Sequence, residues 1–392
     1  MLLKLAWNKI GFKKLNSFLC ILLMGIGVAI ISLIGNLSKQ LEGNFTKSIA
    51  AIDMVVGAKG SPLQLILSSV LHIDAPTGNI PLSEIEKLKK NPLVKKLIPM
   101  SFGDNYKGYR IIGSNPDFLS HYNATFDTGR AVEHSMEVVL GNTIAKHLNL
   151  KEGDTFQSSH GLDAEGQTHK EGFYTVTGIL KANGSVIDKL IICNLNSVWN
   201  IHDHDSNDQI DSREITAALV KFRSPMGLMK LPRMINENTS MQAALPSIEV
   251  NRLFKLFGQG IQIARYLALL IIFISGISVF ISLYNSLKEQ KNEKALMLSL
   301  GASRTEVFLQ LMLEGLILSF LGYIFGILLS KIALTIFTHI FDESNLAKIN
   351  VWQLGQSEIY LFMMALSIGV VSAALPALSI YRINISKTLS RD

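Results

Sequence analysis

The stretch that decides the fold is residues 15–37, which reads LNSFLCILLMGIGVAIISLIGNL and contains no charged residue. A helix needs about 20 predominantly apolar residues to cross the hydrocarbon core of a bilayer. In lipid the backbone must satisfy its own hydrogen bonds, which favours a helix over an irregular segment. We therefore predict a first transmembrane helix over residues 15–37.

Three further stretches are predominantly apolar, over residues 264–287, 307–335 and 359–381, and Glu314 interrupts the second of them. Charged residues make up 17% of the 392-residue chain, against about 25% in soluble domains. This deficit excludes an ordinary cytosolic enzyme. The sequence predicts an α-helical membrane protein with four transmembrane helices and a large extracytoplasmic α+β domain inserted between helices 1 and 2.

The basic residues predict the orientation of the four helices. Residues 1–16, 288–306 and 382–392 hold 11 of the 37 Lys and Arg residues. Cytoplasmic segments next to membrane spans carry such an excess. We expect both termini in the cytoplasm, with residues 38–262 and the short loop 336–358 outside the membrane, in the periplasm if the cell has two membranes. The net charge of +6 is then a membrane feature, and no nucleic-acid partner is expected.

The first 16 residues precede the first span, which is too long for a cleaved signal peptide and is expected to be an uncleaved anchor. Their apolar and basic residues fall on different faces of a helix, which predicts an amphipathic helix lying on anionic lipid. The alternative is the charged flank of an ordinary anchor. The apolar set is Leu2, Leu3, Leu5, Ala6, Trp7 and Ile10, and the basic set is Lys4, Lys9 and Lys13.

The outer domain carries signals of both helices and strands. Ser83 and Glu86 have the spacing of a capping box, which predicts the start of a short helix. Short helices are also expected at 142–148 and 225–237. Runs rich in β-branched and aromatic residues predict strands at 94–99, 109–113, 137–140, 173–180, 190–193 and 215–222.

Two larger features are expected in the same domain. Residues 196–245 are predicted to form a second lobe. Residues 248–263 have apolar residues at helical spacing and lead without a proline into the second span, which predicts a continuous stalk helix.

Several segments resemble a known family. Residues 136–142 (MEVVLGN), 145–148 (AKHL), 153–154 (GD) and 176–179 (VTGI) are similar to the periplasmic core domain of MacB-like permeases. Residues 293–304 (EKALMLSLGASR) resemble that family's cytoplasmic loop, and Pro376, Ala377, Tyr381 and Arg382 resemble its closing segment. The family is that of the type VII ABC transporter permeases, which includes macrolide exporters, the LolC and LolE lipoprotein-release subunits, and FtsX.

The resemblance implies a permease subunit that couples ATP hydrolysis by a separate cytoplasmic ABC ATPase dimer to movement outside the membrane. The expected cargo is hydrophobic or lipidated: a lipoprotein, a peptide or a drug. The alternative is an FtsX-like regulator that transports nothing and switches an outer partner such as a cell-wall hydrolase. Further expected partners are a second permease copy or paralogue, a periplasmic adaptor or lipoprotein, and membrane lipid.

The chain has no Gly-x-x-x-x-Gly-Lys-Ser/Thr loop to hold ATP phosphates. We therefore predict that it is not an enzyme, binds no cofactor itself, and depends on ATP and Mg²⁺ held by the partner ATPase.

The loop 288–306 is predicted to form a coupling helix that lies in a groove of the ATPase. Gly301 and Ala302 are expected to allow a tight turn before the third span. Glu314 is read as a structural residue near this region, with a proton relay as the alternative. The expected contacts are apolar at Leu296, Leu298 and Leu300 and polar at Lys291, Glu293, Lys294 and Arg304.

Residues 63–73 form an apolar run just outside the first span. Gly57 and Gly60 before it suggest tight turns, and Pro62 is expected to open a helix. One hypothesis makes this run a gate for a hydrophobic substrate; the other packs it under the outer domain. The candidate gate residues are Leu63, Leu67, Val70 and Leu71.

Two weaker hypotheses remain. His202 and His204 lie in a segment rich in Asp and could hold a transition metal, but a solvated acidic loop is the favoured interpretation and no metal is expected. Small residues in the third span would allow close helix packing, either with a second copy or as ordinary membrane-helix residues. These are Ser319, Gly322, Gly326 and Ser330.

Overall fold

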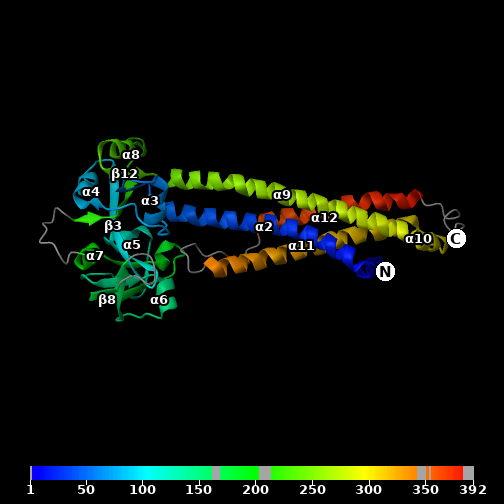
Figure 1. Ribbon diagram of the computed structural model, residues 1–392, viewed down its shortest axis with the longest axis horizontal. Helices are drawn as coiled ribbons and strands as arrows, with labels where there is room; N and C mark the ends of the chain where they lie inside the picture. Colours follow the sequence, from blue (N-terminus) through cyan, green and yellow to red (C-terminus); the bar gives the residue numbers. More distant parts are fainter. Residues whose placement is uncertain (1, 161–167, 203–212, 342–349, 353–354, 383–392) are drawn as a thin grey trace. The chain divides into compact units, whose positions relative to one another are not determined.

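The computed structural model describes residues 2–160, 168–202, 213–341, 350–352 and 355–382 (Figure 1). The chain divides into two compact units. The helix unit contains residues 1–40, 256–341 and 349–392, and the sheet unit contains residues 41–255 together with 342–348. Each is described here by itself.

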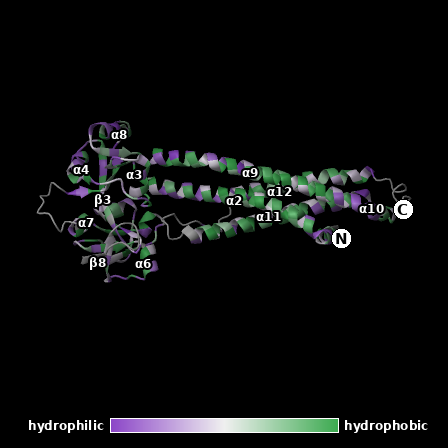
Figure 2. Ribbon diagram, viewed as in Figure 1, coloured by the Kyte–Doolittle hydropathy of each residue, from purple (hydrophilic) through white to green (hydrophobic). Residues whose placement is uncertain are grey.

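Long helices make up most of the helix unit. Four of the described helices are long and apolar enough to cross a membrane. Figure 2 shows hydrophobic residues concentrated along them. The helices of this unit are α1 (Leu2–Phe12), α2 (Lys14–Ile49), α9 (Pro246–Glu289), α10 (Lys291–Ser299), α11 (Arg304–Phe341), α12 (Gln356–Ser379) and the short η3 (Ile380–Arg382).

The first and second spans continue beyond the helix unit. Helix α2 ends at Ile49 and α9 begins at Pro246, so both have residues in the sheet unit. Helix α9 runs without a break, and the segments 248–263 and 264–287 are one helix.

Small residues on α11 pack against other helices of the same chain. A Cβ at Gly326 would lie 2.6 Å from the backbone oxygen of Gly25 on α2, which leaves no room for a side chain. The Ser330 hydroxyl donates to the Ser32 hydroxyl of α2 at 3.1 Å. A Cβ at Gly322 would likewise meet α2. The hypothesis that these residues contact a second copy is therefore wrong for Gly322, Gly326 and Ser330, and Ser319 packs against α12.

The sheet unit is built on ten strands in one sheet, in the order β12-β1-β11-β3-β4-β9-β6-β8-β5, with β7 paired to β3 and β8. Its strands are β1 (Met54–Ala58), β3 (Val94–Tyr106), β4 (Tyr109–Ser114), β5 (Phe126–Gly129), β6 (Glu137–Leu140), β7 (Thr155–His160), β8 (Thr168–Leu180), β9 (Ile191–Asn194), β11 (Ala217–Phe222) and β12 (Met241–Ala244). A second sheet pairs β2 (Ile80–Pro81) with β10 (Glu214–Ile215).

Short helices connect and cover these strands. They are α3 (Pro62–Ser69), α4 (Leu82–Lys89), α5 (Asp117–His121), α6 (Asn142–Leu148), η1 (Val186–Lys189), α7 (Leu195–His202) and α8 (Pro225–Asn238). The predicted strands at 94–99, 109–113, 137–140 and 173–180 and the predicted helices at 142–148 and 225–237 all fall within observed elements.

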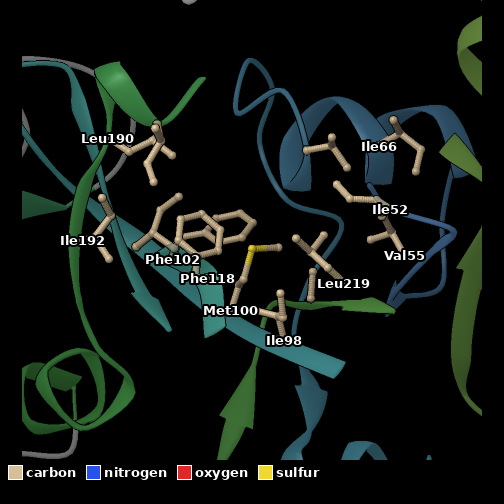
Figure 3. Packing of buried hydrophobic residues seen from close by; sticks show 14 of the residues in the cluster. Ile52, Val55, Ile66, Ile98, Met100, Phe102, Phe118, Leu190, Ile192 and Leu219 are labelled. Atoms are coloured by element: carbon tan, nitrogen blue, oxygen red, sulfur yellow. The ribbon is translucent and has the colours of Figure 1, made fainter. Parts of the chain in front are cut away.

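The sheet has apolar residues on both of its faces. On β1, Val55 belongs to one core cluster, while Met54 and Val56 belong to another. Successive side chains of a strand point to opposite faces, so this alternation places β1 between two layers of core. Figure 3 shows part of the first cluster, in which Met100, Phe102 and Phe118 lie close together.

Three predictions about the outer domain are wrong. Ser83 lies inside α4, whose N-cap is Pro81 without a side-chain hydrogen bond, so there is no capping box. Gly57 lies in strand β1 and not in a turn. Its hydrogen leaves room for α3, because a Cβ there would lie 2.4 Å from Cδ1 of Leu65. Residues 196–245 contribute β11 and β12 to the common sheet rather than forming a separate lobe.

Candidate coupling site

Helix α10 is a short helix held between two turns. Helix α9 ends at Glu289, and the single residue Gln290, at φ −97° and ψ 19°, separates it from α10. After α10, Gly301 adopts φ +100°, a backbone conformation that favours glycine. The tight turn expected at this glycine is confirmed. Ser303 and Glu306 then form reciprocal side-chain and backbone hydrogen bonds at the start of α11.

The predicted apolar contacts divide into two kinds. Leu296 is 52% exposed and Leu300 is 80% exposed. Leu298 is partly buried against an apolar cluster of the helix unit that includes Val307 and Leu311. Large exposed leucines on a charged loop are the residues a partner protein would cover. Leu296 and Leu300 are therefore the stronger candidates for a contact with another protein, and Leu298 fixes α10 to its own chain.

Lys294 does not belong to a polar rim. It is 1% exposed, and its Nζ donates to Oε1 of Gln310 at 2.7 Å. Burial and, next, the positive charge of Lys9 lower the pKa of Lys294 below its usual value of 10.5. The prediction that this lysine contacts the ATPase directly is corrected by its burial inside the helix unit.

Glu314 is the carboxylate of the buried cluster that also contains Lys294 and Gln310. The residue is 3% exposed, its Oε1 accepts from Nε2 of Gln310 at 3.3 Å, and it lies 3.6 Å from Nζ of Lys9. Lys9 comes from α1, so the carboxylate pairs mainly with the N-terminal helix. A buried charge is tolerated when it is paired in this way.

The remaining predicted residues lie at the surface of the same region. Lys291 and Glu293 are exposed on the first turn of α10, and Ala302 is half-buried. Nη1 of Arg304 donates to the backbone oxygen of Tyr381, which joins the start of α11 to the end of the fourth span.

The candidate gate residues lie on and just after α3. Ser61 caps the helix by accepting from Gln64 N, and Pro62 opens it as predicted. Val70 is fully buried and Leu71 is 4% exposed, in the core of the sheet unit. This favours the packing alternative for these two residues.

Leu63 and Leu67 are half-buried and keep some exposed surface. Leu71 borders a cavity of about 50 Å³, which is far smaller than an acyl chain needs. A gate role therefore stays a prediction that concerns Leu63 and Leu67 rather than Val70 and Leu71.

A second buried charged group lies elsewhere in the helix unit and was not predicted. Nζ of Lys331 on α11 lies 3.0 Å from Oε1 of Glu358 on α12, with side-chain exposures of 7% and 3%. Nδ2 of Asn36 on α2 donates to the same oxygen at 3.3 Å. The other carboxylate oxygen accepts from the backbone N of Gly355 at 3.0 Å and caps α12.

The positions of Lys331 and Glu358 in the sequence are compatible with such a pair. Lys331 directly follows the apolar run 307–330, and Glu358 directly precedes the run 359–381. Each resembles an ordinary charged flank of a span. A lysine and a glutamate at corresponding ends of two apolar runs are the pattern of an ion pair between helices.

The metal hypothesis concerns residues at the edge of the described chain. His202 ends α7, and His204 lies in the segment 203–212, outside the described residues. Within the described part of the chain, no three His, Cys, Asp or Glu residues are grouped as metal ligands.

Comparison with known proteins connects this geometry to a family. The FtsX-like permease C-terminal family matches residues 266–385, and the MacB-like periplasmic core domain matches residues 17–226. The chain belongs to the type VII ABC transporter permeases. The resemblance of residues 136–142 and 293–304 to this family is thereby confirmed. This type VII permease has four apolar helices long enough to cross a membrane, and its family has a periplasmic domain. It is therefore an inner-membrane protein with a periplasmic domain.

Individual proteins also resemble this permease. The lipoprotein-releasing system transmembrane protein LolC of Buchnera aphidicola subsp. Schizaphis graminum is 20% identical over 346 residues, which are 84% of this chain and 82% of the relative. The solved periplasmic region of MacB from Actinobacillus actinomycetemcomitans is 12% identical, with a TM-score of 0.35. The match covers 53% of this chain and 97% of that region.

Proposed function

We propose that this permease converts ATP hydrolysis on a separate cytoplasmic ABC ATPase into movement of its periplasmic domain. The observation that carries the proposal is the exposure of Leu296 on helix α10 and of Leu300 at its C-cap, between two turns. The ATPase covers these leucines, and Lys291, Glu293 and Arg304 surround the contact. ATP and Mg²⁺ are bound by the ATPase.

In this proposal both termini and α10 lie in the cytoplasm, and the sheet unit lies between the first and second spans on the periplasmic side. The support is the charge distribution, because Lys and Arg concentrate in residues 1–16, 288–306 and 382–392. Helices α2 and α9 connect the spans to the sheet unit, since each continues beyond its apolar run.

The proposed cargo is a lipidated or otherwise hydrophobic molecule, extracted from the membrane or exported. The support is the relative LolC, whose name assigns it to a lipoprotein-releasing system. Transport by a pair of permeases, identical or paralogous, follows from the two-subunit ATPase. Identification of the molecules that co-purify with the ATP-trapped complex tests this assignment, and a complex free of lipidated or hydrophobic cargo would contradict it.

The coupling assignment is tested by co-purification of the ATPase encoded beside this chain. Leu296→Asp and Leu300→Asp are each expected to weaken the association by about 30-fold or more, because the loss of a central apolar contact costs about 2 kcal/mol or more. The matched control is Leu228→Asp on α8 of the sheet unit, where the leucine is 45% exposed. Association of both α10 variants at the wild-type level would contradict the proposal.

A further inference from the structure

Helix α10 is linked to the rest of the helix unit by a buried chain of polar contacts. Lys294 Nζ donates to Oε1 of Gln310, and Nε2 of Gln310 donates to Oε1 of Glu314. Lys9 of α1 completes the chain at 3.6 Å from the same carboxylate oxygen. Lys294, Gln310 and Glu314 are 1%, 2% and 3% exposed, so water does not compete for these contacts.

The backbone joins α10 to α9 more closely than to α11. Hydrogen bonds from Gln290 N to Ser286 O and from Lys294 N to Gln290 O continue across the junction with α9, whereas Gly301, at φ +100°, interrupts the helix before α11. Ala295 and Leu298 pack against the helix unit, but apolar packing is not directional and does not by itself fix the position of α10. Hydrogen bonds are directional, so the contacts of Lys294 fix the position of α10 along α11.

The Gln310 amide has a defined orientation in this chain. Its oxygen accepts from Lys294 and its nitrogen donates to Glu314. In the reverse orientation two donors would face each other at Lys294 and two acceptors at Glu314. The group contains two lysines, Lys294 and Lys9, and one carboxylate, that of Glu314, because the side chain of Glu293 is exposed at the surface. The group therefore has one more basic than acidic side chain, and the amide at position 310 accepts from Lys294 while it donates to Glu314, which a carboxylate could not do.

We propose that Lys294, Gln310, Glu314 and Lys9 are positioning residues that fasten the coupling helix α10 and the N-terminal helix α1 to α11. Displacement of α10 is then carried into the third span, α11, and not only into α9. The role of α10 rests on the proposed function above. The fastening itself does not, because it lies within this chain.

The fastening is tested on the purified full-length permease without any partner. Lys294→Met keeps an apolar stem of similar length and removes the ammonium group. The amides of α10 are expected to exchange with deuterium about 10-fold faster or more, because a hydrogen bond to a charged group is lost. Lys14→Met, which removes an exposed lysine from the first turn of α2, is the control and is expected to leave α10 unchanged. Wild-type exchange of α10 in Lys294→Met would overturn the proposal.

Gln310→Leu tests the same group at its centre. The leucine has a similar size but removes both the acceptor for Lys294 and the donor to Glu314. We expect faster exchange of α10 than in the wild type, because the chain of contacts is broken. Wild-type exchange in a folded variant would overturn the proposal, and this variant remains informative if Lys294→Met does not fold.

Transmission is tested in the complex with the ATPase. Spin labels at Ile336 on α11 and Tyr284 on α9 report the distance between the two helices before and after ATP is trapped. Lys294→Met is expected to keep the ATPase bound and to lose the ATP-driven change in distance that the wild type shows. A variant that retains the full change would overturn transmission through α11. If the wild type itself binds no ATPase, the proposed function fails, while the exchange experiment still decides the fastening.

Discussion

Lys331 and Glu358 form an ion pair that is almost fully buried among α2, α11 and α12. Bringing two charges out of water is costly, and their attraction repays that cost only when the geometry is good and the remaining polar groups are satisfied. Here the carboxylate has three partners, namely Lys331, Asn36 and the backbone of Gly355. The pair therefore specifies how the three helices meet.

Removal of one partner is expected to cost more than removal of both. Lys331→Met and Glu358→Gln should each destabilise the protein by about 3–5 kcal/mol, since each leaves one buried charge without its partner. The double variant should lose less than the sum of the two. Chemical unfolding of the purified protein in detergent measures these differences, and strictly additive losses would contradict a paired arrangement.

Lys294 predicts a pH dependence of stability. Its folded-state pKa is lowered by burial and then by Lys9, with Glu314 and Glu293 opposing the shift. Between that lowered value and 10.5 the unfolded state binds more protons than the folded state, so the free energy of unfolding rises with pH. The slope is at most about 1.4 kcal/mol per pH unit.

Unfolding experiments from neutral pH upward test this dependence. The difference between the wild type and Lys294→Met should grow in favour of the wild type as the pH rises, because the variant lacks the titrating group. A difference that is constant with pH would contradict burial of this lysine in the folded protein.

At the scale of elements, glycines determine how closely the spans approach. Gly326→Val would place a Cβ 2.6 Å from the backbone oxygen of Gly25, so α11 and α2 would have to separate. We expect a loss of about 1–3 kcal/mol, the usual cost of overpacking. Gly35→Val is the control on α2, because a Cβ there has no neighbour within 4 Å. Thermal unfolding of the two variants measures the difference, and equal melting temperatures would contradict the packing.

The elements that were predicted correctly carry local signals. Glu137–Leu140 is a strand between turn residues, and Pro225 opens α8. Strand β1 was missed because MVVGA is buried on both faces and shows no alternation. Gly57 then resembled a turn, although it serves the packing of α3 on β1.

The same limit applies to the coupling site. The turn at Gly301 was predicted because the backbone conformation of a glycine is a local property. The contact leucines were expected from the family resemblance, and two of the three, Leu296 and Leu300, are exposed. The sequence-based prediction misplaced Lys294 and missed Lys331 and Glu358. Their burial depends on which helices meet in three dimensions, and charge alone does not distinguish a surface lysine from a buried one.

At the scale of the whole molecule, the account requires both termini and α10 on one side of the membrane and the sheet unit on the other. In a background without Cys20 and Cys193, a single cysteine at Lys59 should react with a membrane-impermeant maleimide in intact spheroplasts. Cysteines at Lys4 and Lys288 should react only after the membrane is opened. Labelling of Lys4 and Lys59 from the same side would contradict this topology.

The central claim is that α10 is the contact through which a separate ATPase acts on this chain. A photo-crosslinking amino acid at Leu300, where the side chain is 80% exposed, tests it most directly in native membranes. The account predicts a crosslink to the ATPase from position 300 and none from position 228 on α8. A crosslink to the ATPase from position 228, or its complete lack at position 300 while the two proteins co-purify, would contradict it.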